Sequence, residues 1–327
     1  MNIEARGEFE EARPDGRSKF SMTELSTAIF KDWQVRKTKK QKDDFIAFLR
    51  AQLPELQIEE GGLFRSRNLI LGDIDSAKVV FSAHYDTCAT LPFPNFLTPK
   101  NIPLYILYNL LICLVIFLAA GLLSYLVVSL THRIWAAQLA CLLLCALVFW
   151  LLLGGKPNPV TANDNTSGVI ALCEIYAALS EEERKKAAFV FFDNEELGLL
   201  GSRFFLKRHK QNMQEKLLVN LDCISDGDYL LLIENKRARS EFGAALRAAC
   251  EEAALPAGKE VRWEKSSTTL YPSDQMDFPC YVAVAAFHRG SHVGLYLSRI
   301  HTKRDTVFEE ENLRFFIEAG QNLTRRL

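Results

Sequence analysis

Five short motifs, spread over residues 84–301 of this 327-residue chain, carry histidine and carboxylate side chains of the kind that bind metal ions. They are His84-Tyr85-Asp86, Asp164-Asn165, Glu195-Glu196, Asp222 and His301. Imidazole and carboxylate ligands without thiolates suit zinc, cobalt or manganese. A carboxylate such as Asp164 can bridge two metal ions, with one oxygen on each. The set therefore predicts a site in which two metal ions activate a water molecule for hydrolysis.

Apolar runs that predict buried strands precede most of these motifs. The clearest are 79–83 before His84, 187–192 before Glu195-Glu196, and 217–221 before Asp222. Open α/β sheets bind their ligands at the carboxyl ends of the strands. We therefore expect side chains that are far apart in the sequence to meet at one edge of a sheet.

In two of the motifs, two neighbouring side chains can take different roles, one as a metal ligand and the other as its hydrogen-bond partner or as a proton acceptor. His84 and Asp86 point to the same side if the strand continues, which places Asp86 to hold the second ring nitrogen of His84. In the Glu195-Glu196 pair, one carboxylate can bind metal while the other accepts a proton from water.

Each motif also has a structural explanation when it is taken alone. Asp164 and Asn165 could simply cap the next helix, and Glu195 and Glu196 could be acids near the first turn of a helix. A histidine at a strand end, such as His84, is often only a hydrogen-bonded core residue. The occurrence of all five motifs in one chain, at predicted strand ends, favours the metal site.

The remaining pattern alternates strands with helices, which predicts an α/β fold with a mixed, mainly parallel central sheet flanked by helices. The predicted helices are 20–50, 167–179, 201–210, 240–254 and 310–323, and the predicted strands are 67–71, 78–83, 187–192, 217–221, 229–234, 261–264, 281–287 and 295–297. Residues 1–18 are polar and are expected to form a flexible tail.

An apolar insertion, residues 103–153, separates the first two motifs. Leu104 to Leu130 and Ile134 to Leu153 contain no charged residue, and each reaches the roughly 20 residues that cross a ~30 Å hydrocarbon core. Thr131-His132-Arg133 joins the two runs, which forces them to pack antiparallel. The insertion predicts a transmembrane helical hairpin, although a buried helical pair in a soluble core is the alternative.

A hairpin returns the chain to the side it came from, so residues 19–100 and 156–327 can form a single domain. The chain begins with a polar segment that has no apolar signal-peptide region. Its eight cysteines show no CxxC spacing, which indicates reduced thiols rather than disulfides or a thiolate zinc site. We therefore expect an integral membrane protein with two transmembrane helices and a cytoplasmic catalytic domain.

The motifs together resemble the co-catalytic di-zinc aminopeptidase family, which includes bacterial leucyl aminopeptidases and glutaminyl cyclases. The likeness extends over roughly residues 64–320 apart from the hairpin, and it includes two further motifs, Ser273-Asp274 and 301–306 (HTKRDT). It implies a zinc-exopeptidase fold and two divalent metal ions, with Zn²⁺ as the expected metal. The implied roles are His84 and Asp222 on one metal, Glu196 and His301 on the other, Asp164 as the bridge, Glu195 as the general base and Asp86 as the partner of His84. A cis peptide bond after Asp164 is also implied.

Two features depart from the family pattern. The hairpin interrupts the loop between the first two motifs, and Gln275 stands where the family more often has histidine. The first departure concerns access of the substrate, whereas the second concerns only details of the pocket.

The resemblance implies an exopeptidase that removes residues from the free N-terminus of a peptide, and the predicted hairpin would anchor this enzyme in a membrane. The candidates for the pocket wall are Tyr85, Tyr271, Asp274 and Phe278. The expected partners are a peptide substrate and, through residues 103–153, the lipid bilayer; the net charge of −1 gives no sign of nucleic-acid binding. Two alternatives stay open, a glutaminyl cyclase-like acyltransferase and a catalytically inactive membrane-anchored binding protein. A transporter is disfavoured because the spans carry no acid or base.

Overall fold

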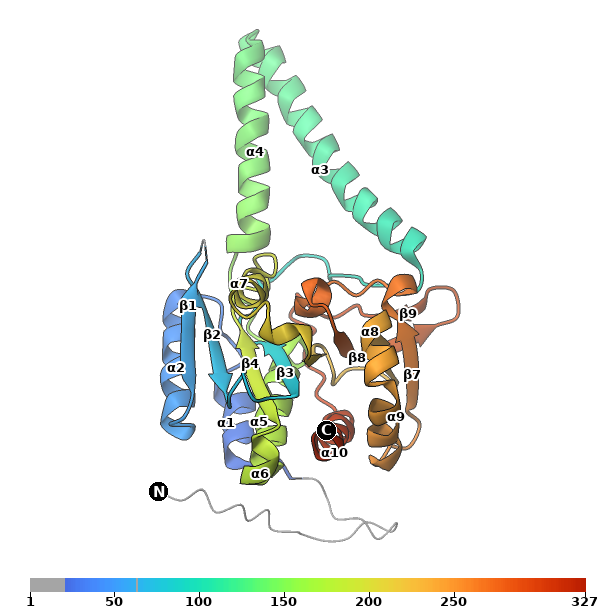
Figure 1. Ribbon diagram of the computed structural model, residues 1–327. Coiled ribbons are helices and arrows are strands. Elements are labelled where there is room, and N and C mark those ends of the chain that lie inside the picture. Colours follow the sequence, from blue (N-terminus) through green and yellow to red (C-terminus); the bar gives the residue numbers. More distant parts are fainter. Residues whose placement is uncertain (1–20, 63) are drawn as a thin grey trace.

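A computed structural model describes residues 21–62 and 64–327, and it contains one mixed nine-stranded sheet with helices on both faces (Figure 1). The strands are β1 (Gln57–Gly61), β2 (Ser66–Leu71), β3 (Val79–His84), β4 (Ala187–Phe192), β5 (Leu217–Leu221), β6 (Tyr229–Glu234), β7 (Glu260–Lys265), β8 (Tyr281–Gly290) and β9 (Gly294–Tyr296). The tail predicted for residues 1–18 lies outside the described residues.

The order of the strands is β1-β2-β4-β3-β5-β8-β6-β7, and β9 pairs with β8. The central strands β4, β3, β5 and β8 run parallel, whereas β2 joins β4, and β6 joins β8, in antiparallel pairs. This arrangement confirms the predicted mixed α/β sheet. Its parallel centre places the carboxyl ends of β3, β4 and β5 at the same edge.

Ten α-helices lie in the described part of the chain. They are α1 (Glu24–Asp32), α2 (Lys39–Gln52), α3 (Ile102–Thr131), α4 (Ile134–Gly154), α5 (Gly168–Ala178), α6 (Glu181–Arg184), α7 (Leu200–Arg208), α8 (Lys236–Glu241), α9 (Gly243–Glu252) and α10 (Glu310–Arg326). Short helical turns lie at η1 (Ala162–Ser167), η2 (Asn212–Gln214), η3 (Ser266–Thr268) and η4 (Asp274–Asp277). Helices α1, α5, α9 and α10 pack together, and α7 packs against β2 and η4.

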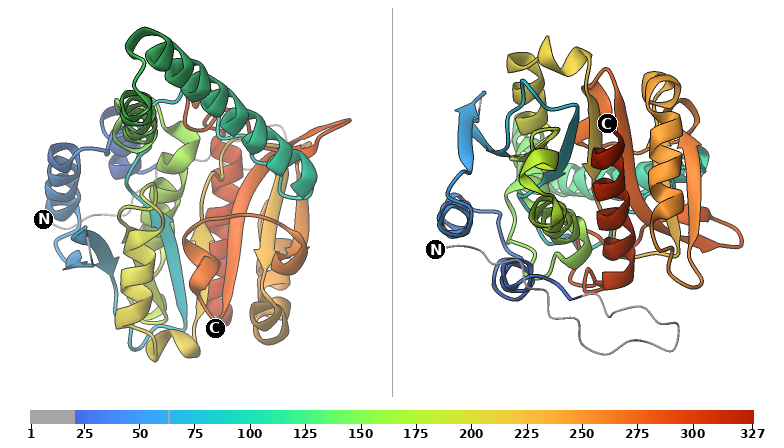
Figure 2. Two further views of the ribbon diagram at one scale, coloured as in Figure 1. Left: turned by 90° about the horizontal axis from the view of Figure 1, so that it is seen from above. Right: turned by 60° about the horizontal axis from the view of Figure 1, so that its bottom comes forward.

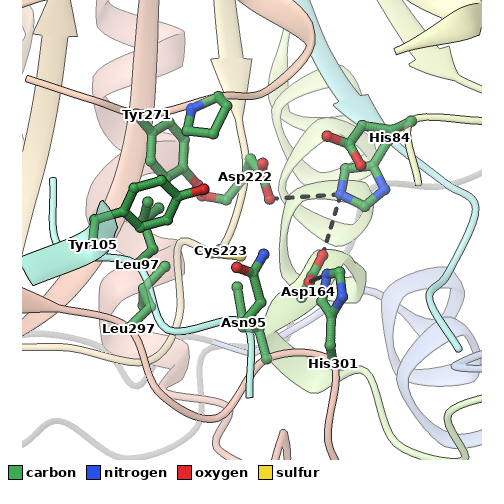
Figure 3. Close-up of a pocket in the computed structure, with 13 residues that line it drawn as sticks. His84, Asn95, Leu97, Tyr105, Asp164, Asp222, Cys223, Tyr271, Leu297 and His301 are labelled. Carbon is green, nitrogen blue, oxygen red and sulfur yellow. Dashed lines mark hydrogen bonds and ion pairs between the residues drawn. The ribbon is translucent and has the colours of Figure 1, made fainter. Parts of the chain in front are cut away.

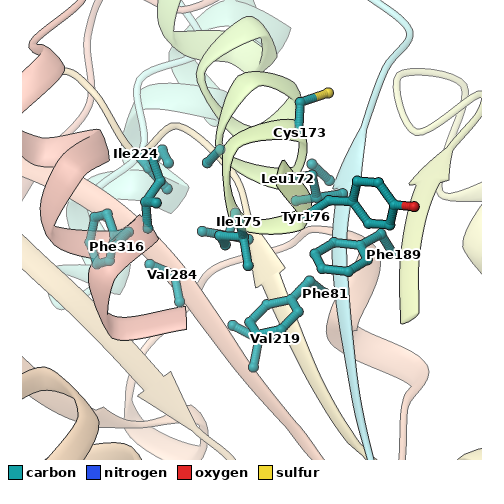
Figure 4. Packing of buried hydrophobic residues seen from close by; sticks show 14 of the residues in the cluster. Phe81, Leu172, Cys173, Ile175, Tyr176, Phe189, Val219, Ile224, Val284 and Phe316 are labelled. Carbon is teal, nitrogen blue, oxygen red and sulfur yellow. The ribbon is translucent and has the colours of Figure 1, made fainter. Parts of the chain in front are cut away.

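The core between the sheet and helices α5 and α10 is built from aromatic and branched side chains (Figure 4). The rings of Phe81 on β3 and Phe189 on β4 stack with their centroids 5.4 Å apart, and Tyr176 of α5 meets Phe189 edge-on. All three are at least nine-tenths buried. Burial of such side chains contributes about 1.5–3 kcal/mol each, so this core fixes the strand ends that carry the site.

Two predicted helices are each divided in the structure. The single helix expected up to residue 50 is instead α1 and α2, because Thr38 begins a new helix through a capping box with Gln41. The side chain of Thr23 caps α1 by accepting a hydrogen bond from the backbone N–H of Ser26. The helix expected at 240–254 forms as α8 and α9, which meet at Gly243. The edge strand β1 was not predicted.

Helices α3 and α4 project away from the sheet as an antiparallel pair (Figure 1). His132 and Arg133 join them, and His132 adopts a left-handed conformation with φ 53°. Both helices are long and apolar enough to cross a membrane, and only Ala120 and Ala137 in them are fully buried. The two helices touch near their joined ends and separate toward the sheet.

Candidate active site

Three parallel strands and two loops bring the candidate ligands together at one edge of the sheet. His84 is the last residue of β3, Glu195 and Glu196 lie in the turn after β4, and Asp222 follows β5. Asp164 comes from the segment before α5, and His301 from the loop after β9. Figure 3 shows His84, Asp164, Asp222 and His301 converging from these elements.

Asp164 lies between the two histidines. Its Oδ1 atom is 3.3 Å from His84 Nε2, and its Oδ2 atom is 3.1 Å from His301 Nε2. His84 Nε2 also lies 3.6 Å from Asp222 Oδ1, and His301 Nε2 lies 3.4 Å from Glu196 Oε2. The side chains therefore form two half-sites, a His84–Asp222 half-site and a His301–Glu196 half-site, which share Asp164.

The carboxylates and imidazoles of the two half-sites perturb one another strongly. Burial alone would raise the pKa of Asp164, but hydrogen bonds to His301 and His84 hold that pKa well below its usual range. Burial raises the pKa of Glu196, His301 lowers it, and the negative charge of Asp164 raises it. The resulting pKa of Glu196 is about 7. Burial lowers the pKa of His301, but Glu196 and Asp164 raise it to about 9. Negative charge thus accumulates between the imidazoles, where a cation would be stabilised.

The donor atoms fit divalent metal ions. Glu196 Oε1 and Asp222 Oδ1, one in each half-site, are buried carboxylate oxygens with no hydrogen-bond partner among the described residues. A buried carboxylate oxygen without a partner is costly, and a cation in each half-site would supply that partner. Imidazole nitrogens and carboxylate oxygens are the ligands expected for zinc.

The Cys88 thiol also lies close enough to Glu196 and His301 to join their half-site. Burial raises the pKa of the Cys88 thiol well above its usual value, and the charge of Glu196 raises it further. Metal binding requires the thiolate. The raised pKa of the Cys88 thiol therefore favours the imidazole and carboxylate ligands over this residue.

Asp86 lies beside both His84 and the turn that carries Glu195 and Glu196. The Nδ1 atom of His84 lies 3.0 Å from the Asp86 backbone carbonyl oxygen, and the Asp86 carboxylate is farther away at 3.7 Å. That carboxylate also accepts hydrogen bonds from the backbone N–H groups of Glu195 and Glu196, at 3.0 and 3.2 Å. Asp86 thereby links the end of β3 to the turn that carries the two glutamates.

The Asp164–Asn165 peptide bond is cis, as the resemblance implied. The Asp305 carboxylate accepts hydrogen bonds from the backbone N–H groups of Asn163 and Asp164, both at 3.0 Å. The side chain of Asn165 donates to the carbonyl oxygen of Leu221, at 2.9 Å, and so ties the same segment to the end of β5. These contacts fix the backbone on both sides of Asp164.

With this geometry established, comparison with known proteins identifies the family. The model for peptidase family M28 matches residues 151–323. The chain belongs to peptidase family M28. This membership confirms the resemblance to the zinc aminopeptidases that was derived from the motifs.

Two fungal proteins are similar in sequence to this M28 chain. It is 36% identical over 88 residues to the probable leucine aminopeptidase 2 of Aspergillus oryzae and to that of Aspergillus fumigatus. The similarity covers 25% of this chain and 18% of each fungal protein. The chain therefore corresponds to a small part of the length of these relatives.

Solved structures of similar shape show the same fold. The LapA aminopeptidase of Legionella pneumophila has a TM-score of 0.53 at 13% identity, covering 93% of this chain and 68% of that one. The glutaminyl cyclase of Porphyromonas gingivalis has a TM-score of 0.56 at 15% identity, covering 94% of this chain and 99% of that one. At these identities the comparison supports the fold alone.

A cavity of about 90 Å³ adjoins both half-sites in this M28 chain (Figure 3). Its remaining wall combines residues from the chain before α3, the first turn of α3, and the loops around β5, η4 and β9. These residues are Asn95, Leu97, Tyr105, Glu195, Cys223, Tyr271, Pro272, Leu297 and Ile300. Only Tyr271 of the four pocket residues proposed from the sequence lines the cavity, and its hydroxyl donates to the Asp222 backbone carbonyl oxygen at 2.8 Å.

The other three pocket candidates lie elsewhere. Tyr85 is fully buried and stacks on Phe45, because successive residues along an extended chain point to opposite sides and Tyr85 lies between His84 and Asp86. Phe278 packs in the apolar cluster on the α7 side of the sheet. Asp274 is buried near Glu195, and burial raises its pKa to about 7.

Arg36 was not considered from the sequence, and it is fully buried beside the site. Its Nε donates to the Tyr85 carbonyl oxygen at 2.5 Å, and its guanidinium also donates to Thr166 Oγ1 at 3.1 Å. Burial lowers the pKa of Arg36 to about 10 against the opposing charges of Asp86 and Asp164. The run Lys37-Thr38-Lys39-Lys40 gives this region the appearance of a solvated basic face, so no sequence signal marks Arg36.

Proposed function

We propose that this chain is a membrane-anchored metallo-aminopeptidase that hydrolyses the peptide bond next to a free N-terminus. The position of Asp164, with one oxygen near each of two buried histidines, carries this proposal. Membership in peptidase family M28 supports the reaction class. The name of the two similar fungal proteins, probable leucine aminopeptidase 2, supports an exopeptidase.

Each half-site is proposed to hold one divalent cation, most simply Zn²⁺. His84 and Asp222 would hold one, His301 and Glu196 the other, and Asp164 would contact both. Two such cations, when bound, lower the pKa of a water molecule and polarise the scissile carbonyl group.

Glu195 is proposed as the general base. It lines the cavity beside the His84–Asp222 half-site, and its backbone is fixed by the hydrogen bond to Asp86. Burial raises the pKa of Glu195 well above its usual value, as expected of a carboxylate that must take up a proton near neutral pH. It would accept the proton of the attacking water and pass it to the leaving nitrogen.

The apolar part of the cavity wall is proposed to receive the side chain of the N-terminal residue. The apolar lining of the cavity comprises Leu97, Tyr271, Pro272, Leu297 and Ile300. Burying an apolar side chain there releases about 25 cal/mol per Å² of surface removed from water. This wall would therefore bind aliphatic residues better than charged ones.

Helices α3 and α4 are proposed to anchor the protein in a bilayer as two transmembrane helices, with residues 19–100 and 156–327 as one metallopeptidase domain on the same side. Their length and composition support this. The proposed side is the cytoplasm, because the described cysteines are all free thiols.

The direct test is a glutamate-to-glutamine substitution in the full-length protein, purified in lipid nanodiscs with zinc. Glu195→Gln should lower turnover of aminoacyl fluorogenic substrates by at least about 10²-fold, because the general base is lost. Metal content, measured by mass spectrometry, should stay at the wild-type level. The matched control is Glu215→Gln, which changes an exposed glutamate outside the cavity and should leave both quantities unchanged.

Full activity of the Glu195→Gln variant would exclude the proposed base. Absence of hydrolysis in a wild-type protein that holds its metal would exclude the aminopeptidase. The glutaminyl cyclase alternative predicts ammonia release from peptides that begin with glutamine, and assaying such peptides alongside separates the two reactions.

A further inference from the structure

The first turn of α3 forms part of the wall of the candidate active site. Tyr105, the fourth residue of this helix, lines the cavity together with Leu97 from the preceding segment (Figure 3). The helix rises about 1.5 Å per residue, so Tyr105 lies only about 5 Å along the axis from the start of α3. A proposed membrane span therefore begins at the cavity itself.

The base of α3 is fixed to the loops that bear the site. Leu97 and Leu297 exchange two backbone hydrogen bonds, at 3.2 and 2.9 Å, and Leu91 N–H donates to the His301 carbonyl oxygen at 2.8 Å. The hydroxyl of Tyr108 donates to the carbonyl oxygen of Pro94 at 2.8 Å. These contacts hold the start of the helix against the His301 loop, so the membrane cannot be distant from the cavity.

The length of α3 places this region at the membrane surface. Its 30 residues extend about 45 Å, roughly 15 Å more than the hydrocarbon core of a bilayer. The excess brings Tyr105 and Tyr108 to the level of the lipid headgroups, where tyrosines are favoured. Figures 1 and 2 show the base of α3 above the same edge of the sheet, with the base of α4 separated from it.

One face of α3 continues from the cavity into the span. This face consists of partly buried residues that recur every three or four positions, namely Tyr105, Tyr108, Ile112 and Ile116. It ends at Ala120, which is buried and marks the side of α3 that faces α4. Leu114, on the opposite side, is 51% exposed. An apolar helix face therefore leads directly to a cavity that opens at the membrane surface.

We propose that the substrate of this cavity is the N-terminal tail of a polypeptide that is itself embedded in the same membrane, with its transmembrane segment beside the inner face of α3. The inference rests on the proposed aminopeptidase function and names its substrate class. An extended chain spans about 3.3–3.6 Å per residue, so a tail of about five residues reaches about 17 Å beyond the core. A cavity at headgroup level is within that reach.

The test uses the full-length zinc-loaded protein in lipid vesicles with three substrates that share one N-terminal sequence. One is a soluble peptide, and two are fused to an apolar transmembrane helix through tails of about five and about twenty residues. The short-tailed substrate should be cleaved at least about tenfold faster than the soluble peptide at equal concentration. It should also be cleaved within about threefold of the rate of the long-tailed substrate.

Equal cleavage of the soluble and embedded substrates, or cleavage of the long tail without the short one, would overturn the inference while leaving the aminopeptidase intact. Failure to cleave any of the three, with metal bound, would instead contradict the proposed function. The long-tailed substrate controls for simple concentration in the membrane, because it gains from co-localisation without needing a cavity at the surface.

A second measurement locates the substrate helix. A photo-crosslinking p-benzoylphenylalanine at Ile112, on the inner face of α3, should capture the short-tailed substrate. The same residue at Leu114, at the same depth on the outer face, should capture at least about fivefold less. Equal capture at the two positions, or none at position 112, would show that the substrate helix does not follow α3.

Discussion

Asp305 illustrates how a residue outside the two half-sites controls them. Its carboxylate binds the backbone N–H groups of Asn163 and Asp164, and no other side chain in the described chain does so. Burial raises the pKa of Asp305, and the charge of Asp164 raises it further, to about 8. The Asp305 carboxyl group therefore ionises at a higher pH in the folded protein than in the unfolded chain, where its pKa is about 3.9.

This raised pKa predicts a pH-dependent stability difference between the wild type and Asp305→Asn after metal removal. In the folded state Asp305 keeps its proton up to about pH 8, whereas in the unfolded state it loses it near pH 4, so unfolding releases a proton in this window. The unfolding free energy of the wild type should therefore fall, relative to the variant, as the pH rises from about 4 to about 8. Chemical denaturation of the full-length protein at several pH values measures this.

Asp277, an exposed aspartate that forms an ion pair with Arg203, provides the control for Asp305. Asp277→Asn changes an aspartate at the surface, and the difference from the wild type should not follow the same pH course. A constant difference between the wild type and Asp305→Asn across the window would show that Asp305 titrates normally in the folded protein.

At the scale of elements, the segment 162–168 is held between α5 and the end of β5. Gly168 begins α5, and a Cβ at this position would meet Leu221 O at 2.4 Å and Asn165 Oδ1 at 2.5 Å. The close approach is possible only without a side chain. The same approach brings Asp164 to the carboxyl ends of β3 and β5.

Gly168→Ala should therefore displace α5 from β5 and move Asp164 out of the shared position. We expect a loss of stability of about 1–3 kcal/mol from overpacking and a reduced metal content, measured by thermal unfolding and mass spectrometry. Gly121→Ala is the matched control, since a Cβ there meets no atom within 4 Å. If Gly168→Ala keeps both properties at wild-type values, the contact does not position the site.

At the scale of the whole molecule, the hairpin interrupts a single sheet. Strand β3 precedes α3, and its neighbours β4 and β5 follow α4. If α3 and α4 span a membrane as proposed, the sheet can form only when both parts of the chain lie on one side of it. An even number of spans meets this condition, and the His132-Arg133 tip should then lie on the opposite side.

Cysteine accessibility tests this topology. The side chains of Lys39, before the hairpin, and Glu182, after it, are 83% and 81% exposed. Lys39→Cys and Glu182→Cys should both be protected from a membrane-impermeant maleimide in intact cells, whereas His132→Cys should react. Reaction of positions 39 and 182 with protection of position 132 would place the domain outside the cell. Reaction of all three, or different behaviour of positions 39 and 182, would contradict the hairpin.

The sequence by itself determined the features that depend on local patterns. The apolar runs before His84, Glu195 and Asp222 predicted β3, β4 and β5 almost to the residue, because buried parallel strands need continuous apolar side chains. The two long uncharged runs predicted α3 and α4, because a helix that crosses a bilayer needs about 20 consecutive apolar residues. The ligand types and their place at strand ends predicted a metal site, whereas the two half-sites and the place of Asp164 between them were implied by the resemblance to the aminopeptidase family.

Only the tertiary structure decided which side chains support the site and what forms the cavity wall. Tyr85 lies one residue from two site residues, yet it points into the core, whereas Tyr105 is brought to the cavity by contacts between Leu97 and Leu297. Arg36 and Asp305 act through backbone atoms far away in the sequence. Such contacts depend on how distant segments pack, and no local spacing records them.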